Sequence, residues 1–202
     1  MPRPRSLSLT DVATAALAVI DRDGLAGFAM RAVAVELGMG TMSLYRYVSD
    51  RAQLEALVVD LVLADVEMTP PRSTWQRQLT ALATRMRNAI AAHPEVGSLL
   101  VIHRQSSVNS LRWGESVVTV MADAGFSPAR RVVALRCLMG YVIGSMQLDH
   151  HGPLAGTGTD VIAAQGNFPV LAETARHGRR MSAEEEFRRG LDVVLRGLSD
   201  EP

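Results

Sequence analysis

The sequence predicts an all-α protein with two parts, a short N-terminal helical domain and a longer helical bundle. Apolar residues make up 48% of the chain and aromatic residues only 4%, and the many Ala, Leu and Met residues favour helix over sheet. Apolar residues also recur three and four positions apart, which is the spacing of one helix face. A chain of 202 residues can bury a sizeable core. We therefore expect domains at residues 1–50 and 51–202.

The first helix is expected to begin near residue 9, because Ser8 and Asp11 have the spacing of a capping box. Before it, MPRPRSL forms a basic arm that can either reach nucleic acid or remain a solvated tail. The helix should end near Asp23 and Gly24. Its apolar stripe consists of Val12, Ala15, Ala16, Val19 and Ile20.

Residues 30–48, MRAVAVELGMGTMSLYRYV, predict two short helices joined by a tight turn. Gly38 can end the first helix, because glycine takes the left-handed conformation without a steric penalty. Gly40 permits a restart at the next N-cap. Leu44 and Val48 then point inward, and the polar and aromatic side chains left outside suit the major groove of DNA. The pattern predicts a helix-turn-helix motif, although a helical hairpin within a core has the same spacing.

This stretch resembles the DNA-binding domain of TetR-family transcriptional regulators over about residues 8–63. The family pattern is an arginine, an aliphatic-alanine pair, Leu-Gly-aliphatic, a polar stretch, and Leu-Tyr followed by aromatic or aliphatic positions. The family usually has a helix-capping, phosphate-touching threonine where this chain has Ala29, so about 1 kcal/mol of capping is expected to be missing. The matching residues are Arg31, Val33-Ala34, Leu37-Gly38-Met39, residues 40–43 and Leu44-Tyr45-Arg46-Tyr47-Val48.

The resemblance implies that the second helix of the motif reads base edges in double-stranded DNA. Arginine can bond bidentately to guanine, so Arg31 and Arg46 are the best candidates for sequence reading. Tyr45 can instead pack between the helices. The implied DNA-contacting residues are Arg31, Thr41, Met42, Ser43, Tyr45, Arg46 and Tyr47, with Arg51 just beyond the motif as a phosphate anchor.

One such helix reads only a few base pairs, so the resemblance implies a homodimer on a palindromic operator. The half-sites would lie about 34–36 Å apart, or a multiple of that distance. The helices expected at residues 127–149 and 183–198 are implied to pack against their symmetry mates as a four-helix bundle. Their apolar stripes agree with this, although a monomeric core would show the same stripes. Repression by occlusion of the operator is the expected outcome.

The second part of the chain predicts a series of amphipathic helices. Asp50 and Gln53 have capping spacing for a helix at residues 51–67, which Thr69-Pro70-Pro71 ends. A flexible loop is expected at residues 150–166, because glycine and proline are frequent and periodicity is weak there. Further helices are expected at residues 73–92, 95–104, 108–124, 127–149, 168–176 and 183–198.

The second part also implies a small-molecule site whose ligand releases DNA, because flexible Met side chains suit adaptable apolar pockets. Its order of elements resembles the subgroup that includes the tetracycline repressor, where a histidine helps hold a metal-bound drug. Leu100 stands at that histidine's position and His103 is out of register, so we expect an apolar effector and no metal. Constitutive DNA binding without a ligand is the alternative. The candidate lining residues, each of which can instead be ordinary core, are Met86, Ile90, Trp113, Val117, Met121, Met139 and Met146.

Composition and motifs restrict the remaining classes. All 21 basic residues are arginine and 21 acidic residues balance them, so net charge gives no argument for nucleic acid. The single cysteine, Cys137, excludes an internal disulfide and is expected to be a buried, inert thiol. No apolar run reaches the roughly 18 residues that span a bilayer, so we expect a cytoplasmic protein. The sequence contains no Glu-x-x-His pair, phosphate loop or nucleophile motif, so it predicts neither an enzyme nor a cofactor. His150 and His151 are adjacent, so they lack the i, i+4 helical spacing of metal ligands.

Overall fold

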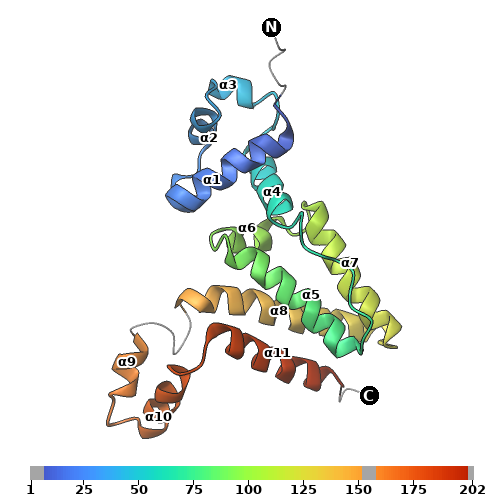
Figure 1. The fold of residues 1–202 in the computed structure, drawn as a ribbon, viewed down its shortest axis with the longest axis vertical. Helices are drawn as coiled ribbons and strands as arrows, with labels where there is room; N and C mark the ends of the chain where they lie inside the picture. Colours follow the sequence, from blue (N-terminus) through green and yellow to red (C-terminus); the bar gives the residue numbers. More distant parts are fainter. Residues whose placement is uncertain (1–6, 152–157, 200–202) are drawn as a thin grey trace. The chain divides into compact units, whose positions relative to one another are not determined.

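Every regular element in the computed structural model is an α-helix, within the residues that it describes, 7–151 and 158–199 (Figure 1). The all-α prediction is therefore confirmed. Contacts divide the chain into two units. The first unit comprises residues 1–68 and 88–116, and the second comprises residues 69–87 and 117–202. The functional division predicted at residues 50 and 51 stays a prediction.

The first unit begins with α1 (Leu9–Gly27), α2 (Met30–Glu36) and α3 (Thr41–Leu44). The predicted capping box is present at the start of α1, where the Ser8 hydroxyl accepts from the Asp11 amide at 3.1 Å and the Asp11 carboxylate accepts from the Ser8 amide at 2.8 Å. Gly24 interrupts α1 with a φ of 67°, at the predicted helix end. All five residues of the predicted apolar stripe are buried.

The helix α4 (Arg51–Val62) packs against α1 on one side and α6 (Val96–His103) on the other. Asp50 caps it by accepting from the Gln53 amide at 2.8 Å, as predicted. The helix ends at Val62, five residues before the predicted Glu67, because its last turn tightens: the Ala64 amide donates to the carbonyl of Leu61.

Hydrogen bonds to Asp60, near the end of α4, hold the start of α7 (Val108–Asp123). The Asp60 carboxylate accepts from the Ser107 hydroxyl at 2.6 Å and from the Asn109 amide at 2.9 Å. The Ser107 hydroxyl in turn accepts from the Ser110 amide at 3.0 Å, which caps the helix. Within the first unit, α4 is therefore bonded to the segment that follows α6 as well as packed against α6 itself.

The second unit contains the start of α5 (Trp75–Ala91), the end of α7, and α8 (Pro128–His151), which runs beside α11 (Ala183–Ser199) (Figure 1). Tyr141 of α8 stacks on Phe187 of α11 with ring centroids 5.7 Å apart, and its hydroxyl donates to the Phe187 carbonyl at 2.8 Å. The apolar stripe of α11 faces inward: Phe187, Leu191, Leu195 and Leu198 are buried and Val194 is half-buried.

Aromatic side chains close the other end of the α8–α11 pair. Gly125, with a φ of 85°, follows the end of α7, and Pro128 begins α8. Phe126 between them meets the Trp75 ring edge-on at 5.2 Å, and the Arg130 guanidinium lies 4.0 Å from the Phe126 ring centroid. These contacts join α5, α8 and the α7–α8 turn within the second unit.

Two expectations for the second unit were wrong. The predicted loop at residues 150–166 contains the end of α8 and all of α9 (Gly158–Ala163), which packs against α10 (Pro169–Gly178) (Figure 1). A six-residue helix is too short to show periodicity, and residues 152–157 lie outside the described residues. Cys137 is exposed rather than buried, because α8 carries apolar residues on its outer face as well as its inner face.

Candidate nucleic-acid interface

The turn between α2 and α3 has the geometry of a Schellman motif. Gly38 has a φ of 65°, the left-handed conformation predicted for it. Its amide donates to the Val35 carbonyl at 3.0 Å, and the Met39 amide donates to the Ala34 carbonyl at 2.9 Å. These two bonds satisfy carbonyls at the end of α2 and fix the direction in which the chain enters α3.

The regular part of α3 is shorter than the predicted second helix. Residues 45–47 continue as a turn, in which the Tyr47 amide donates to the Leu44 carbonyl three residues earlier, at 2.9 Å. Leu44 and Val48 are buried, as predicted. The helix and its turn are thereby anchored at both ends, and the intervening side chains are left at the surface.

The predicted DNA-contacting side chains gather on this outer surface. Met42 is 81% exposed and Tyr45 is 45% exposed, so Tyr45 is not packed away between the helices. Arg31 and Arg46 are also exposed, and Thr41, Ser43 and Tyr47 are half-buried. Six of the eight candidates lie on residues 41–47, Arg31 lies on α2, which packs against α3, and Arg51 is the first residue of α4.

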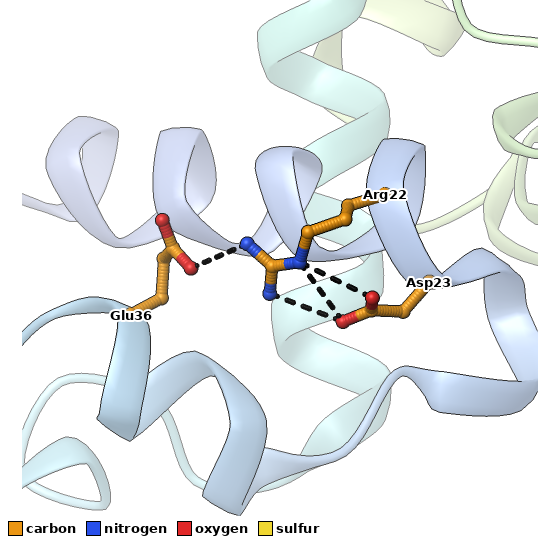
Figure 2. Close-up of polar contacts among 3 residues, drawn as sticks. All are labelled: Arg22, Asp23 and Glu36. Atoms are coloured by element: carbon orange, nitrogen blue, oxygen red, sulfur yellow. Dashed lines mark hydrogen bonds and ion pairs between the residues drawn. The ribbon is translucent and has the colours of Figure 1, made fainter.

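A cluster of ion pairs around Arg22 links α2 to α1, and sequence analysis missed it. Figure 2 shows that Arg22 of α1 lies between two carboxylates: its Nη1 donates to Glu36 of α2 at 2.8 Å, and its Nη2 donates to Asp23 at 3.0 Å. Hydrogen bonds to Asp23 and then Glu36 raise the pKa of Arg22 above its ordinary range. The cluster is exposed to solvent, so its role is to orient α2 more than to stabilise the fold.

Ala29 is the N-cap of α2 and makes no side-chain capping bond. Its backbone is extended, with φ of −143° and ψ of 153°, which is the conformation that a capping threonine would also adopt. The predicted absence of a side-chain cap at this position is therefore confirmed.

The predicted phosphate anchor Arg51 is held on two sides. Its Nε donates to Glu55 Oε1 at 2.7 Å, and its guanidinium lies 5.1 Å from the centroid of the buried Phe28 ring. Half of the Arg51 side chain remains exposed. Glu55 also contacts His103 of α6, whose Nε2 lies 2.7 Å from its Oε2. Sequence analysis missed the Glu55–His103 contact, because residues 48 positions apart leave no local signal. It also missed the Arg51–Glu55 pair, which the i,i+4 spacing on a predicted helix could have indicated.

The predicted effector-contacting residues are mostly buried. Met86, Val117 and Met121 in the second unit are at most 2% exposed, as are Ile90 and Trp113 in the first unit. Met139 and Met146 of α8 are half-buried. Burial is equally a property of core residues, so their role as ligand contacts stays a prediction.

Within the described residues, no three histidine, cysteine, aspartate or glutamate side chains lie close enough to hold a metal ion. His103 is engaged by Glu55. His150 and His151 lie in the last turn of α8, and their side chains are outside the described ones. In the ranges 7–151 and 158–199, no helix combines the length and apolarity needed to cross a membrane.

Comparison with known proteins agrees with this geometry. Residues 69–201 match the family model described as the tetracyclin repressor-like, C-terminal domain. Repressor DrrR1 of Streptomyces coeruleorubidus is 33% identical over 186 residues, which cover 88% of this chain and 67% of that protein. The class E tetracycline repressor of Escherichia coli is 29% identical, with coverage of 96% and 91%.

Solved structures show the same fold. Apo ActR from Streptomyces coelicolor superposes with a TM-score of 0.83 at 24% identity, covering 96% of each chain. BioQ bound to its double-stranded DNA operator gives a TM-score of 0.71 at 24% identity, covering 97% of this chain and 100% of that one. With the helix-turn-helix geometry and the matched C-terminal model, these findings establish that the chain belongs to the TetR family of transcriptional regulators.

Proposed function

We propose that this chain is a dimeric repressor that binds a palindromic DNA operator and is released from it by a small apolar effector. The observation that carries the proposal is the exposed set of Arg31, Met42, Tyr45 and Arg46 on a helix-turn-helix whose inner residues are buried. The described fold is shared by BioQ, solved with its operator, and by ActR, solved with actinorhodin. The proposed division assigns DNA binding to residues 1–50 and effector binding and dimerisation to residues 51–202.

In the proposed complex, α3 and the turn after it enter the major groove. Arg46 would bond guanine O6 and N7, and Arg31 would do so from α2. Thr41, Ser43 and Tyr47 would donate to phosphates or base edges, and the exposed Met42 would contact a thymine methyl group. Because net charge is zero, affinity depends on these local contacts rather than on the overall charge of the protein.

Dimerisation through α8 and α11 is supported by apolar residues on the outer side of the second unit. Val132 and Val133 of α8 and Val193 of α11 are each at least 47% exposed. The inner faces of the same helices are already covered by their mutual packing. Covering the outer valines with a second copy would remove apolar surface from water, which is the main driving force for subunit association.

For the effector, we propose contacts with the five candidates of the second unit, Met86, Val117, Met121, Met139 and Met146. Their thioether and aliphatic side chains would accept a flat or irregular apolar molecule by changing rotamer rather than backbone. Binding would release DNA only if the effector prefers the conformation that does not fit the operator. Action on chromosomal DNA would place the protein in the cytoplasm.

The proposal is tested by fluorescence anisotropy with DNA from upstream of the protein's own gene and with sites selected from random sequence. Wild type is expected to bind a palindromic site with a steep dependence on salt, since phosphate contacts release counterions. Arg46→Ala should lose sequence preference while keeping much of its nonspecific affinity. A small-molecule library is then screened by thermal shift, and ligands that raise the melting midpoint are added to the operator complex.

Failure of wild type to prefer any sequence in the random selection would overturn the DNA-binding proposal. Specific binding that no stabilising ligand weakens would instead favour a constitutive regulator without an effector. Sedimentation of the free protein as a monomer at the concentrations used for binding would overturn the dimer.

A further inference from the structure

A continuous chain of contacts runs from the proposed phosphate anchor Arg51 to the end of α6. Glu55, on the buried side of α4, uses one carboxylate oxygen for Arg51 Nε and the other for His103 Nε2, both at 2.7 Å. The side chains of Glu55 and His103 are only 12% and 8% exposed. A buried carboxylate is tolerated when its oxygens are bonded, and here each oxygen has one charged or polar donor.

The contacts of Arg51 leave one edge of its guanidinium available. Nε donates to Glu55, and the guanidinium carbon Cζ lies 5.1 Å from the centroid of the Phe28 ring. Among the described residues, neither Nη atom of Arg51 has a hydrogen-bond partner. A planar fork held by its Nε in this way presents two parallel N–H groups, which is the geometry that bonds a phosphate bidentately.

His103 connects this arrangement to α6, of which it is the last residue. Its Nε2 lies within hydrogen-bond distance of Glu55 Oε2, so the imidazole ring is engaged with α4. Asp60 of α4 is bonded to the start of α7, and Arg104 donates to the carbonyl of Val101.

We propose that Glu55 is a positioning residue for DNA binding, which orients Arg51 toward a phosphate, and that His103 holds the Glu55 carboxylate in place from α6. The inference rests on the proposed DNA-binding function. It adds residues that touch no DNA themselves.

The direction of the change in DNA affinity distinguishes a positioning role of Glu55 from an effect of its charge alone. Glu55→Gln removes one negative charge close to a phosphate contact, so electrostatics alone would strengthen DNA binding. Positioning predicts the opposite, a loss of operator affinity of about five- to tenfold, because the amide cannot accept from both donors. Asp65→Asn is the matched control. It removes the same charge from an exposed residue of the first unit, and should leave binding unchanged or slightly stronger.

The salt dependence gives a readout that a merely structural defect would not change. Each lost phosphate contact lowers the slope of log K against log salt by about 0.9. Glu55→Gln and His103→Leu are both expected to lower the slope, whereas Asp65→Asn should not. Arg51→Lys keeps the charge but lacks the Nε donor, so it should lose affinity with little change in slope. Because Arg51 is half-exposed, this variant serves even if a buried substitution unfolds the protein.

A double substitution completes the test. His103→Leu added to Glu55→Gln should cause little further loss of operator affinity, because the two residues act through the same contact. Variants that fold and bind with wild-type affinity and slope would overturn the inference. Failure of wild type itself to prefer an operator would refute the proposed function instead.

Discussion

Replacing Gly38 with alanine is expected to destabilise the first unit through backbone conformation alone. At a φ of 65° an L-residue is strained, while a Cβ built at Gly38 meets nothing within 4 Å, so no steric clash contributes. The left-handed conformation costs a non-glycine residue roughly 1–2 kcal/mol, partly offset by the lower entropy of the unfolded chain. We expect a net loss of about 1 kcal/mol, or about 2–4 °C in melting temperature.

Two companion substitutions isolate this cause. Gly40→Ala adds the same methyl group in the same turn at a φ of −74°, again with nothing within 4 Å. It should change stability by less than about 0.5 kcal/mol, because the gain from the unfolded chain offsets the poorer N-cap. Gly38→Asn should fall between glycine and alanine, since asparagine tolerates the left-handed region better.

The assay is urea unfolding followed by tryptophan fluorescence in a Trp75→Phe background. Trp113, buried in the first unit, is then the only tryptophan of the chain and reports on that unit. At position 38, the free energy of unfolding is expected to be highest with glycine, lower with asparagine and lowest with alanine. Equal stability of the three, or an equal loss in Gly40→Ala, would refute the conformational explanation.

Three further predictions concern other parts of the chain. Gly190→Ala places a Cβ 2.8 Å from Cε2 and Cζ of Tyr141, so it should lower the free energy of unfolding by about 1–3 kcal/mol, measured by thermal unfolding. Gly197→Ala is the control, because a Cβ there meets open space and should not lower stability. Equal effects of the two substitutions would contradict the packing argument. Ala29→Thr should raise the free energy of unfolding in urea by about 1 kcal/mol, because a threonine hydroxyl can cap the start of α2. An unchanged free energy of unfolding would mean that the hydroxyl makes no bond there. Hydrogen bonds from the Gln53 backbone amide, and then from the Ser49 hydroxyl, hold the pKa of Asp50 below its ordinary 3.8. The stability that the Asp50 carboxylate contributes is therefore present above pH 3.8 and is lost as the pH falls through the lowered pKa. Unfolding midpoints between about pH 2 and 5 should therefore fall less with acid in Asp50→Asn, and parallel profiles would contradict this.

Local signals in the sequence were sufficient to predict most helix boundaries. Ser8, Gly38 and Asp50 each act on backbone groups a few residues away, so their capping roles follow from spacing alone. The apolar stripe of α11 recurs at helical spacing, but that spacing did not distinguish packing within the chain from packing against a second copy. The outward position of the DNA-binding candidates follows from the same reasoning, because inward Leu44 and Val48 leave their neighbours outside.

The features that escaped prediction depend on contacts between distant residues or on very short elements. The Glu55–His103 bond joins two helices, and Arg22 finds Glu36 across a turn whose path the sequence does not specify. The helix α9 is one and a half turns long and lies in a glycine-rich stretch. Burial of Cys137 was inferred from apolar neighbours, but α8 is apolar on both faces, and periodicity cannot then distinguish inner from outer.

The exposed position of Cys137 on α8 has a practical consequence. Because the chain has no other cysteine, a maleimide fluorophore or nitroxide would attach at one site per molecule without any engineered substitution. Cys137 follows Val133 by one turn of α8, on the face proposed to pair with a second copy, so association would shield the thiol. The rate of maleimide reaction on the wild-type chain, measured across a dilution series, could then follow whether two copies associate and whether an added compound changes that association.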